Sequence, residues 1–279
     1  MIVDNCSNKI NKDQLIQFSR FNQRIHCCFN DKNSGYAAGN NFGIIEAYKR
    51  FAYFDKICIM NPDVVIPSAN VLYDMVSILN KRNDIGALTV KTIFNGKTEN
   101  PNVCAWRFFS KITILLQGTI IGKLLFNNQY YLNLDNNADL DSLSIVDVVQ
   151  GCFFMINRNV FEGIEFFDDR TFLYYEEMIL AKKLLNNGYR NAVLVKHYIY
   201  HNHTSKDRDL KNIIKKTFDM KCYLDSRLYY LDKYMVGNRL YKLFAKTFLV
   251  IDYRLKKIIL RFLLNEVNML ITAFKLRYK

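Results

Sequence analysis

Apolar and polar residues form blocks along residues 2–200 that predict strands and helices in turn. Short apolar runs rich in β-branched residues predict strands, and apolar residues three or four positions apart predict helices. Because the two kinds of block alternate, we expect an α/β fold with a doubly wound, mainly parallel sheet flanked by helices. The predicted strands cover residues 2–3, 24–29, 57–60, 85–91, 145–149, 152–157 and 191–200, and the predicted helices cover residues 12–21, 40–52, 68–82, 159–162 and 174–187.

Two stretches depart from this alternation. Residues 92–144 lose the regular pattern and gain asparagines, which predicts an irregular, partly helical insertion of the kind that often carries substrate contacts. From residue 205 onward the chain reads as helical and basic. We therefore expect an α/β domain over residues 1–204 and a basic, amphipathic helical tail over residues 205–279.

Positive charge is concentrated in this tail. The net charge is +13, and residues 239–279 contain ten Lys or Arg against two acidic residues. Apolar residues recur there at roughly helical spacing, and basic amphipathic helices commonly bind anionic membrane surfaces. Two alternatives remain: the apolar face packs on the rest of the protein, or the tail binds nucleic acid. The basic residues alternate with aliphatic side chains rather than stacking aromatics, which disfavours nucleic acid.

Composition narrows the cellular setting. Half of the residues are hydrophobic and the seven cysteines show no paired Cys-x-x-Cys spacing, so we expect neither a disulfide framework nor a zinc site. No apolar stretch is long enough to span a bilayer, and the first residues leave no room for a signal peptide. These features predict a cytoplasmic protein that is peripheral on the inner face of the cell membrane.

A carboxylate follows the most clearly buried predicted strand. The apolar run of residues 57–60 stops at Asn61-Pro62-Asp63. Proline cannot continue a ladder, so Asp63 is expected on a rigid turn at the end of the strand, where α/β sheets bind ligands. Such a carboxylate can hold a divalent cation against a diphosphate. Asn, Pro and Asp also form ordinary turns, which is the alternative.

Other chemically capable residues occur at similar positions. Asp4 follows the first predicted strand, and His201 and His203 follow the last. Glu176 and Glu177 stand near the start of a predicted helix, where they could act as proton acceptors or simply offset the helix dipole.

Four ordered segments together resemble the inverting, nucleotide-sugar-dependent glycosyltransferases of family 2, especially their rhamnosyltransferase-like branch. They are Val3-Asp4-Asn5-Cys6-Ser7, residues 33–41, Met60-Asn61-Pro62-Asp63, and residues 151–201. The resemblance implies a GT-A fold. It further implies transfer of rhamnose or another hexose from a nucleoside-diphosphate donor to a glycan or lipid-linked acceptor, in cell-surface polysaccharide synthesis, with no nucleic-acid partner.

The resemblance also implies roles for individual residues. Asp4 would contact the base of the nucleotide, and Asn40 would support the nucleotide pocket. Asn61 and Asp63 occupy the first and last positions of the family's metal-binding Asp-x-Asp, so Asp63 would hold Mg²⁺ or Mn²⁺. His201 would close the site near the diphosphate and the metal.

The same resemblance assigns the proton acceptor to Glu177, with Glu176 beside it. Relatives usually carry Asp at position 177 and two glycines within residues 164–167, where this chain has Ile-Glu-Phe-Phe. Relatives also carry a strand and a helix ahead of the Val3 segment, which predicts either a misassigned start or a truncated gene. These departures keep one alternative open: a catalytically inactive, glycosyltransferase-like binding protein.

Overall fold

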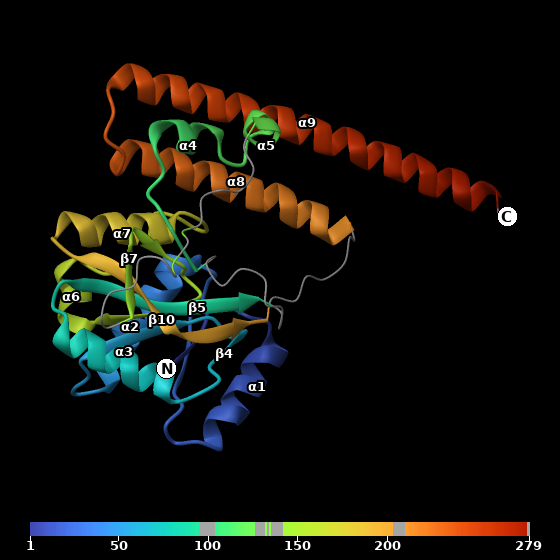
Figure 1. The fold of residues 1–279 in the computed structure, drawn as a ribbon. Helices are drawn as coiled ribbons and strands as arrows, with labels where there is room; N and C mark the ends of the chain where they lie inside the picture. Colours follow the sequence, from blue (N-terminus) through green and yellow to red (C-terminus); the bar gives the residue numbers. More distant parts are fainter. Residues whose placement is uncertain (95–103, 126–131, 133, 135–141, 203–209, 278–279) are drawn as a thin grey trace. The chain divides into compact units, whose positions relative to one another are not determined.

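The computed structural model describes residues 1–94, 104–125, 132, 134, 142–202 and 210–277 (Figure 1). They divide into two compact units, the first made of Met1–Phe108 and Tyr130–Lys206 and the second of Phe109–Gln129 and Asp207–Lys279. Part of the segment expected as an insertion in the α/β domain therefore belongs to the same unit as the C-terminal helices.

The first unit is built on a mixed sheet (Figure 1). Its strands lie in the order β3 (Lys56–Met60), β9 (Phe153–Asn157), β5 (Ile85–Phe94), β10 (Arg190–His201) and β4 (Val64–Val65), and β7 (Leu143–Val146) also pairs with β10. The expectation of a mainly parallel sheet is wrong: β5 and β10 are parallel, whereas β9, β4 and β7 each run antiparallel to their neighbours. The reason is that β9 lies between β3 and β5 and is antiparallel to both. Consequently β3, β5 and β10 still point the same way, and their carboxyl ends share one edge.

Two small sheets complete the strands. β1 (Ile2–Asp4) and β2 (Cys27–Phe29) are parallel, and β6 (Ala105–Trp106) and β8 (Val148–Val149) are antiparallel. The single strand predicted over residues 145–149 is thus divided between β7 and β8. Asp147 separates them, because its carboxylate accepts a hydrogen bond from the Phe108 amide at 2.9 Å and its backbone oxygen accepts one from Asn191 at 2.8 Å.

Helices cover both faces of the central sheet. β9 shows this directly, since its successive side chains point to opposite faces. Phe154 and Ile156 join a core with residues of α2, α6 and α7, whereas Phe153 and Met155 join a core with residues of α3. The helices of this unit are α1 (Lys9–Arg20), α2 (Tyr36–Arg50), α3 (Asn70–Lys81), α6 (Arg158–Gly163) and α7 (Glu176–Asn186).

The second unit is helical, as the sequence predicts for the end of the chain. It contains α4 (Lys111–Leu116), α5 (Ile120–Leu125), α8 (Leu210–Lys233) and α9 (Arg239–Arg277). The buried carboxylate of Asp252 on α9 accepts a hydrogen bond from the Ile120 amide at 2.8 Å. Among the helices that the structure describes, none combines the length and the apolar character that crossing a bilayer needs.

Candidate active site

The predicted site residues stand at or just after the carboxyl ends of strands. Asp4 ends β1, the turn with Asn61 and Asp63 follows β3, and His201 ends β10. β3 and β10 point the same way within the central sheet, so Asp63 and His201 meet at one edge. His203 lies outside the described residues.

Asp63 and His201 form a direct pair. The Nε2 atom of His201 lies 3.1 Å from Oδ1 of Asp63. The imidazole is buried, with 6% of its side chain exposed, whereas 33% of the Asp63 side chain is exposed. Two backbone contacts fix the turn: the amide of Val64 donates to the oxygen of Asn61 at 3.1 Å, and that of Asn202 donates to the oxygen of Asp63 at 3.0 Å. The histidine therefore braces a carboxylate that still reaches solvent.

The possible metal ligands at this turn suit a divalent cation that is also bound by a diphosphate. Within the described residues, no group of three or more His, Cys, Asp or Glu could hold a metal by itself. Mg²⁺ is usually bound through one or two carboxylates, substrate phosphates and water rather than by an all-protein cage. Asp63 supplies such a carboxylate and His201 an adjacent nitrogen. These residues suit Mg²⁺ or Mn²⁺ when a phosphate ligand completes the coordination.

Asn5 organises the loop at the end of β1. Its side-chain amide donates to Oδ1 of Asn33 at 3.0 Å and to the backbone oxygen of Gly35 at 2.9 Å, and its oxygen accepts from Asn30 at 3.1 Å. Asp4, beside it, is buried and accepts a hydrogen bond from the Ser7 amide at 3.0 Å. These hydrogen bonds join the loop after β1 to the loop that leads into α2. Asn5 is a functional candidate that the sequence did not single out.

Helix α2 begins directly after these two joined loops, and glycine is needed at its start. Gly35 has φ +88°, and a Cβ there would lie 2.1 Å from the backbone oxygen of Phe172. At Gly39 a Cβ would lie 2.9 Å from the side-chain nitrogen of Asn5, so the helix packs closely on the loop. Asn40 donates its side-chain amide to the oxygen of Tyr36 within the same helix, at 2.9 Å. Its predicted role in the nucleotide pocket stays a prediction.

The Glu176-Glu177 pair begins α7, directly after two residues with a strained backbone. Tyr174 and Tyr175, the two preceding residues, have φ +75° and +69°, and left-handed backbone is unfavourable for residues other than glycine. Strain of this kind concentrates at functional sites. Burial raises the pKa of both carboxyl groups. In Glu177 the Gly151 amide, which donates to Oε1 at 3.4 Å, opposes that shift because it favours the ionised form.

The turn at residues 150–152 connects these parts. The Tyr36 hydroxyl donates to the backbone oxygen of Gly151 at 2.5 Å, and the Asn61 amide donates to that of Cys152 at 2.8 Å. Burial raises the pKa of the Cys152 thiol to about 12, with further contributions from the charges of Glu177 and Asp63. Asp63 and Glu177 therefore both lie within electrostatic range of one thiol.

A series of hydrogen bonds also links the Asn5 loop to Glu177. Asn5 bonds Gly35, the next residue Tyr36 bonds Gly151, and Gly151 bonds Glu177. The structure thus brings Asn61, Asp63 and His201 together directly and links Glu177 to them through the turn. Tyr36, Gly151 and Cys152 lie within segments that carry the family resemblance, but the sequence pattern assigned them no role of their own. Their contacts join distant parts of the chain, and Tyr36 and Gly151 are 115 residues apart.

A family model describes much of the chain. The model of "Glycosyl transferase family 2" matches residues 1–164, which include Asp4, Asn40, Asn61 and Asp63. Residues 176, 177 and 201 lie beyond the matched span. A search of the curated proteins finds no match.

Solved structures of low sequence identity share the fold. The mannosyltransferase PcManGT from Pyrobaculum calidifontis, in complex with GDP-Man and Mn²⁺, aligns with a TM-score of 0.52 and 12% identity over 90% of this chain and 60% of its own. GalNAc-T7 with UDP, GalNAc and Mn²⁺ aligns with a TM-score of 0.52 and 13% identity over 88% of this chain and 46% of its own. The chain thus spans about half of the length of these proteins. The α/β fold with its mixed sheet is similar to that of GT-A glycosyltransferases.

Proposed function

Because the chain belongs to glycosyl transferase family 2, we propose that it transfers a sugar from a nucleoside-diphosphate donor to a glycan or lipid-linked acceptor, with inversion at the anomeric carbon. One observation carries the proposal. The turn at residues 151–152 contacts both sides of the site: the Gly151 amide donates to Oε1 of Glu177 at 3.4 Å, and the Cys152 oxygen accepts from the amide of Asn61, two residues before Asp63, at 2.8 Å. A candidate cation ligand and a candidate proton acceptor therefore occur within one region. An inverting transfer needs these two groups on opposite sides of the reacting carbon.

On the donor side, Asp4 and the Asn5 loop would contact the nucleotide, and Asp63 would face the diphosphate. A cation held by Asp63 and the phosphates would neutralise the charge that develops on the departing diphosphate. A third of the Asp63 side chain is exposed, and His201 contacts its Oδ1 atom. Both structural neighbours were solved with a nucleotide or nucleotide sugar and Mn²⁺, which supports a divalent cation here.

On the acceptor side, Glu177 would accept the proton of the attacking hydroxyl. A general base works best when its pKa lies near the working pH. Burial raises the pKa of Glu177, and the hydrogen bond from the Gly151 amide opposes that shift. Rhamnose is the first sugar to test, since Asn61 takes the place of the first Asp of Asp-x-Asp as in the rhamnosyltransferase-like branch.

Variants of the two carboxylates test the proposal. With a screen of nucleotide sugars and release of nucleoside diphosphate as the readout, Glu177→Gln should lower kcat by about 10²–10⁴-fold. Asp63→Ala should remove metal-dependent turnover, and Asp13→Ala, an exposed acid on α1, should leave turnover unchanged. Turnover that survives in both Asp63→Ala and Glu177→Gln would refute the mechanism. Donor binding by calorimetry without any turnover would instead support the non-catalytic alternative.

We also propose that α9 binds an anionic membrane surface. One face of α9 packs within its own unit, where Ala245 and Leu249 are buried. Another face leaves apolar side chains at helical spacing exposed to solvent, beside Lys and Arg residues, as an interfacial helix requires. The exposed residues are Leu240, Phe244, Ile251, Leu255, Ile258 and Phe262.

Vesicle binding tests this surface without disturbing the buried face. Phe244→Glu and Ile258→Glu should each reduce sedimentation of the protein with anionic vesicles, because each places a charge where an apolar side chain would insert. Tyr73→Glu, at an exposed aromatic residue of α3, serves as the matched control. Equal binding to neutral and anionic vesicles, or no effect of either α9 variant, would contradict the proposal.

A further inference from the structure

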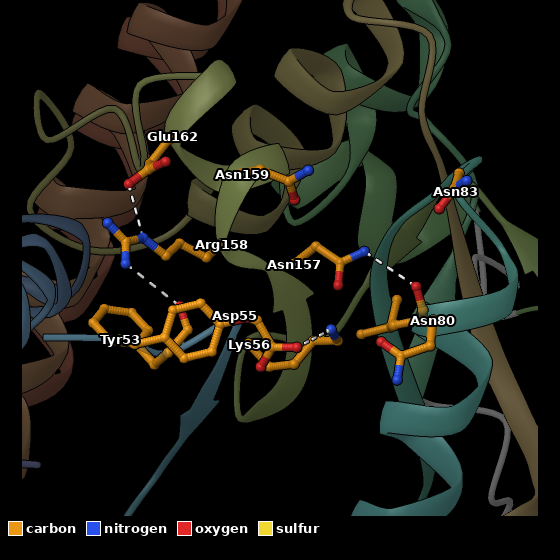
Figure 2. Close-up of a pocket in the computed structure, with 11 residues that line it drawn as sticks. Tyr53, Asp55, Lys56, Asn80, Asn83, Asn157, Arg158, Asn159 and Glu162 are labelled. Carbon is orange, nitrogen blue, oxygen red and sulfur yellow. Dashed lines mark hydrogen bonds and ion pairs between the residues drawn. The ribbon is translucent and has the colours of Figure 1, made fainter. Parts of the chain in front are cut away.

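A hollow, shown in close-up in Figure 2, lies at the start of β3, whereas the candidate active site follows the end of that strand. Its volume is about 420 Å³. Lys56, which begins β3, and Asn157, which ends β9, both line it, whereas the turn with Asp63 follows the other end of β3. Five residues of strand span roughly 17 Å. The hollow is therefore separate from the site of the proposed transfer.

The charged side chains of this pocket neutralise one another. Arg158 lies 3.0 Å from Glu162, and Lys56 lies 2.9 Å from Asp55 (Figure 2). The guanidinium of Arg158 also lies over the ring of Phe54, 4.8 Å from its centre. Two cations and two anions thus cancel, and the arginine is already held by two partners. The pocket therefore offers no unbalanced charge to attract a phosphate or a metal cation. Its charge balance suits a neutral polar ligand instead.

Side-chain amides supply hydrogen-bonding groups in the pocket. Each asparagine offers both donors and an acceptor, which is the combination that sugar hydroxyls use. The amide of Asn157 donates to the backbone oxygen of Leu79 at 3.3 Å (Figure 2). The side chains of Asn80 and Asn83 are exposed and make no hydrogen bond within the part of the chain that the structure describes. The asparagines that line the pocket are Asn80, Asn83, Asn157 and Asn159.

An exposed aromatic ring lines the same pocket, on the opposite side of the view from Asn80 and Asn83 (Figure 2). Tyr53 lines the pocket and is 80% exposed (Figure 2). A tyrosine ring offers an apolar face and a polar hydroxyl, and the C–H face of a pyranose can stack on such a ring. From the neutral charge balance, the amides of Asn80 and Asn83 and the ring of Tyr53, we propose that this pocket binds a neutral, pyranose-containing oligosaccharide. The inference goes beyond the proposed transfer and concerns binding at a second place.

Ligand-observed NMR and calorimetry on the full chain test it, with short neutral homo-oligomers of glucose, mannose, galactose and N-acetylglucosamine as probes. At least one probe should bind. Tyr53→Ala should weaken that binding by about two- to tenfold, as loss of a ring contact does, and Asn83→Ala by a similar factor through lost hydrogen bonds. Tyr73→Ala, whose ring is 75% exposed and does not line the pocket, is the matched control and should leave the affinity unchanged.

Binding should also persist in Asp63→Ala, because that residue follows the other end of β3. The inference is overturned if no probe binds, if Tyr73→Ala weakens binding as much as Tyr53→Ala, or if Asp63→Ala abolishes it. These readouts do not depend on turnover. A chain that binds the probes but transfers no sugar would refute the proposed function alone, and a chain that transfers sugar but binds no probe would refute this inference alone.

Discussion

Replacing Gly151 with alanine would show whether the position of the Glu177 carboxylate governs turnover. The backbone of Gly151 lies outside the left-handed region, so alanine would cause no backbone strain there. Its Cβ would, however, lie 2.9 Å from Oε1 of Glu177, and ordinary contact begins at 3.4 Å. The carboxylate must therefore move by about 0.5 Å. Since a misplacement of about 1 Å can cost about 10²-fold in rate, we expect kcat to fall about tenfold.

The assay is release of nucleoside diphosphate at saturating donor, with KM for the donor measured in parallel. KM should change less than kcat, because Gly151 contacts the proposed base directly and the nucleotide loop only through Tyr36. Gly163→Ala is the matched control, since a Cβ at Gly163 meets nothing within 4 Å. Full kcat in Gly151→Ala, or an equal fall in kcat in Gly163→Ala, would refute the reasoning that the Glu177 position limits the rate.

Two further predictions concern stability. Glu165 is exposed and has φ +58°, so Glu165→Gly should raise the free energy of unfolding by about 0.5–1 kcal/mol, the relief of left-handed strain less the entropy cost of glycine. Glu165→Ala keeps the left-handed strain. If urea denaturation shows an equally large increase in the free energy of unfolding in Glu165→Ala, the prediction is contradicted. Burial raises the pKa of Glu176, so the folded state binds more protons than the unfolded state, and stability should fall as the pH rises above about 4.3. In urea denaturation at a series of pH values, the free energy of unfolding should fall less with rising pH in Glu176→Gln than in the unmodified protein. Parallel pH profiles of the two proteins would contradict this prediction.

Local pattern was enough to predict most elements of the first unit but not how they pair. The apolar run at residues 57–60 is β3, and the run at residues 85–91 is the greater part of β5. Strand direction is decided by tertiary pairing, which is why the insertion of β9 between β3 and β5 was not foreseen. The division of residues 145–149 follows from contacts of Asp147 with Phe108 and Asn191, far from it in sequence.

The candidate site shows the same division between local and distant information. Asp63 could be predicted because proline and asparagine mark the end of an apolar strand, and its neighbour His201 because it ends another. Gly151 and Tyr36 could not, since a glycine in a turn and a tyrosine in a helix have many ordinary roles. Glu165 and Phe166 have φ +58° and +55°, a left-handed backbone that glycine adopts without strain, within the stretch where the resemblance implies two glycines.

The contacts that run from Asn5 through Tyr36 and Gly151 to Glu177 have a thermodynamic consequence. If a nucleotide binds at the Asn5 loop as proposed, its binding would also restrict the Glu177 carboxylate and would supply the entropic cost of ordering both. An acceptor that arrives afterwards finds its partner already restrained, so we expect positive cooperativity between the two substrates even without a change of backbone conformation.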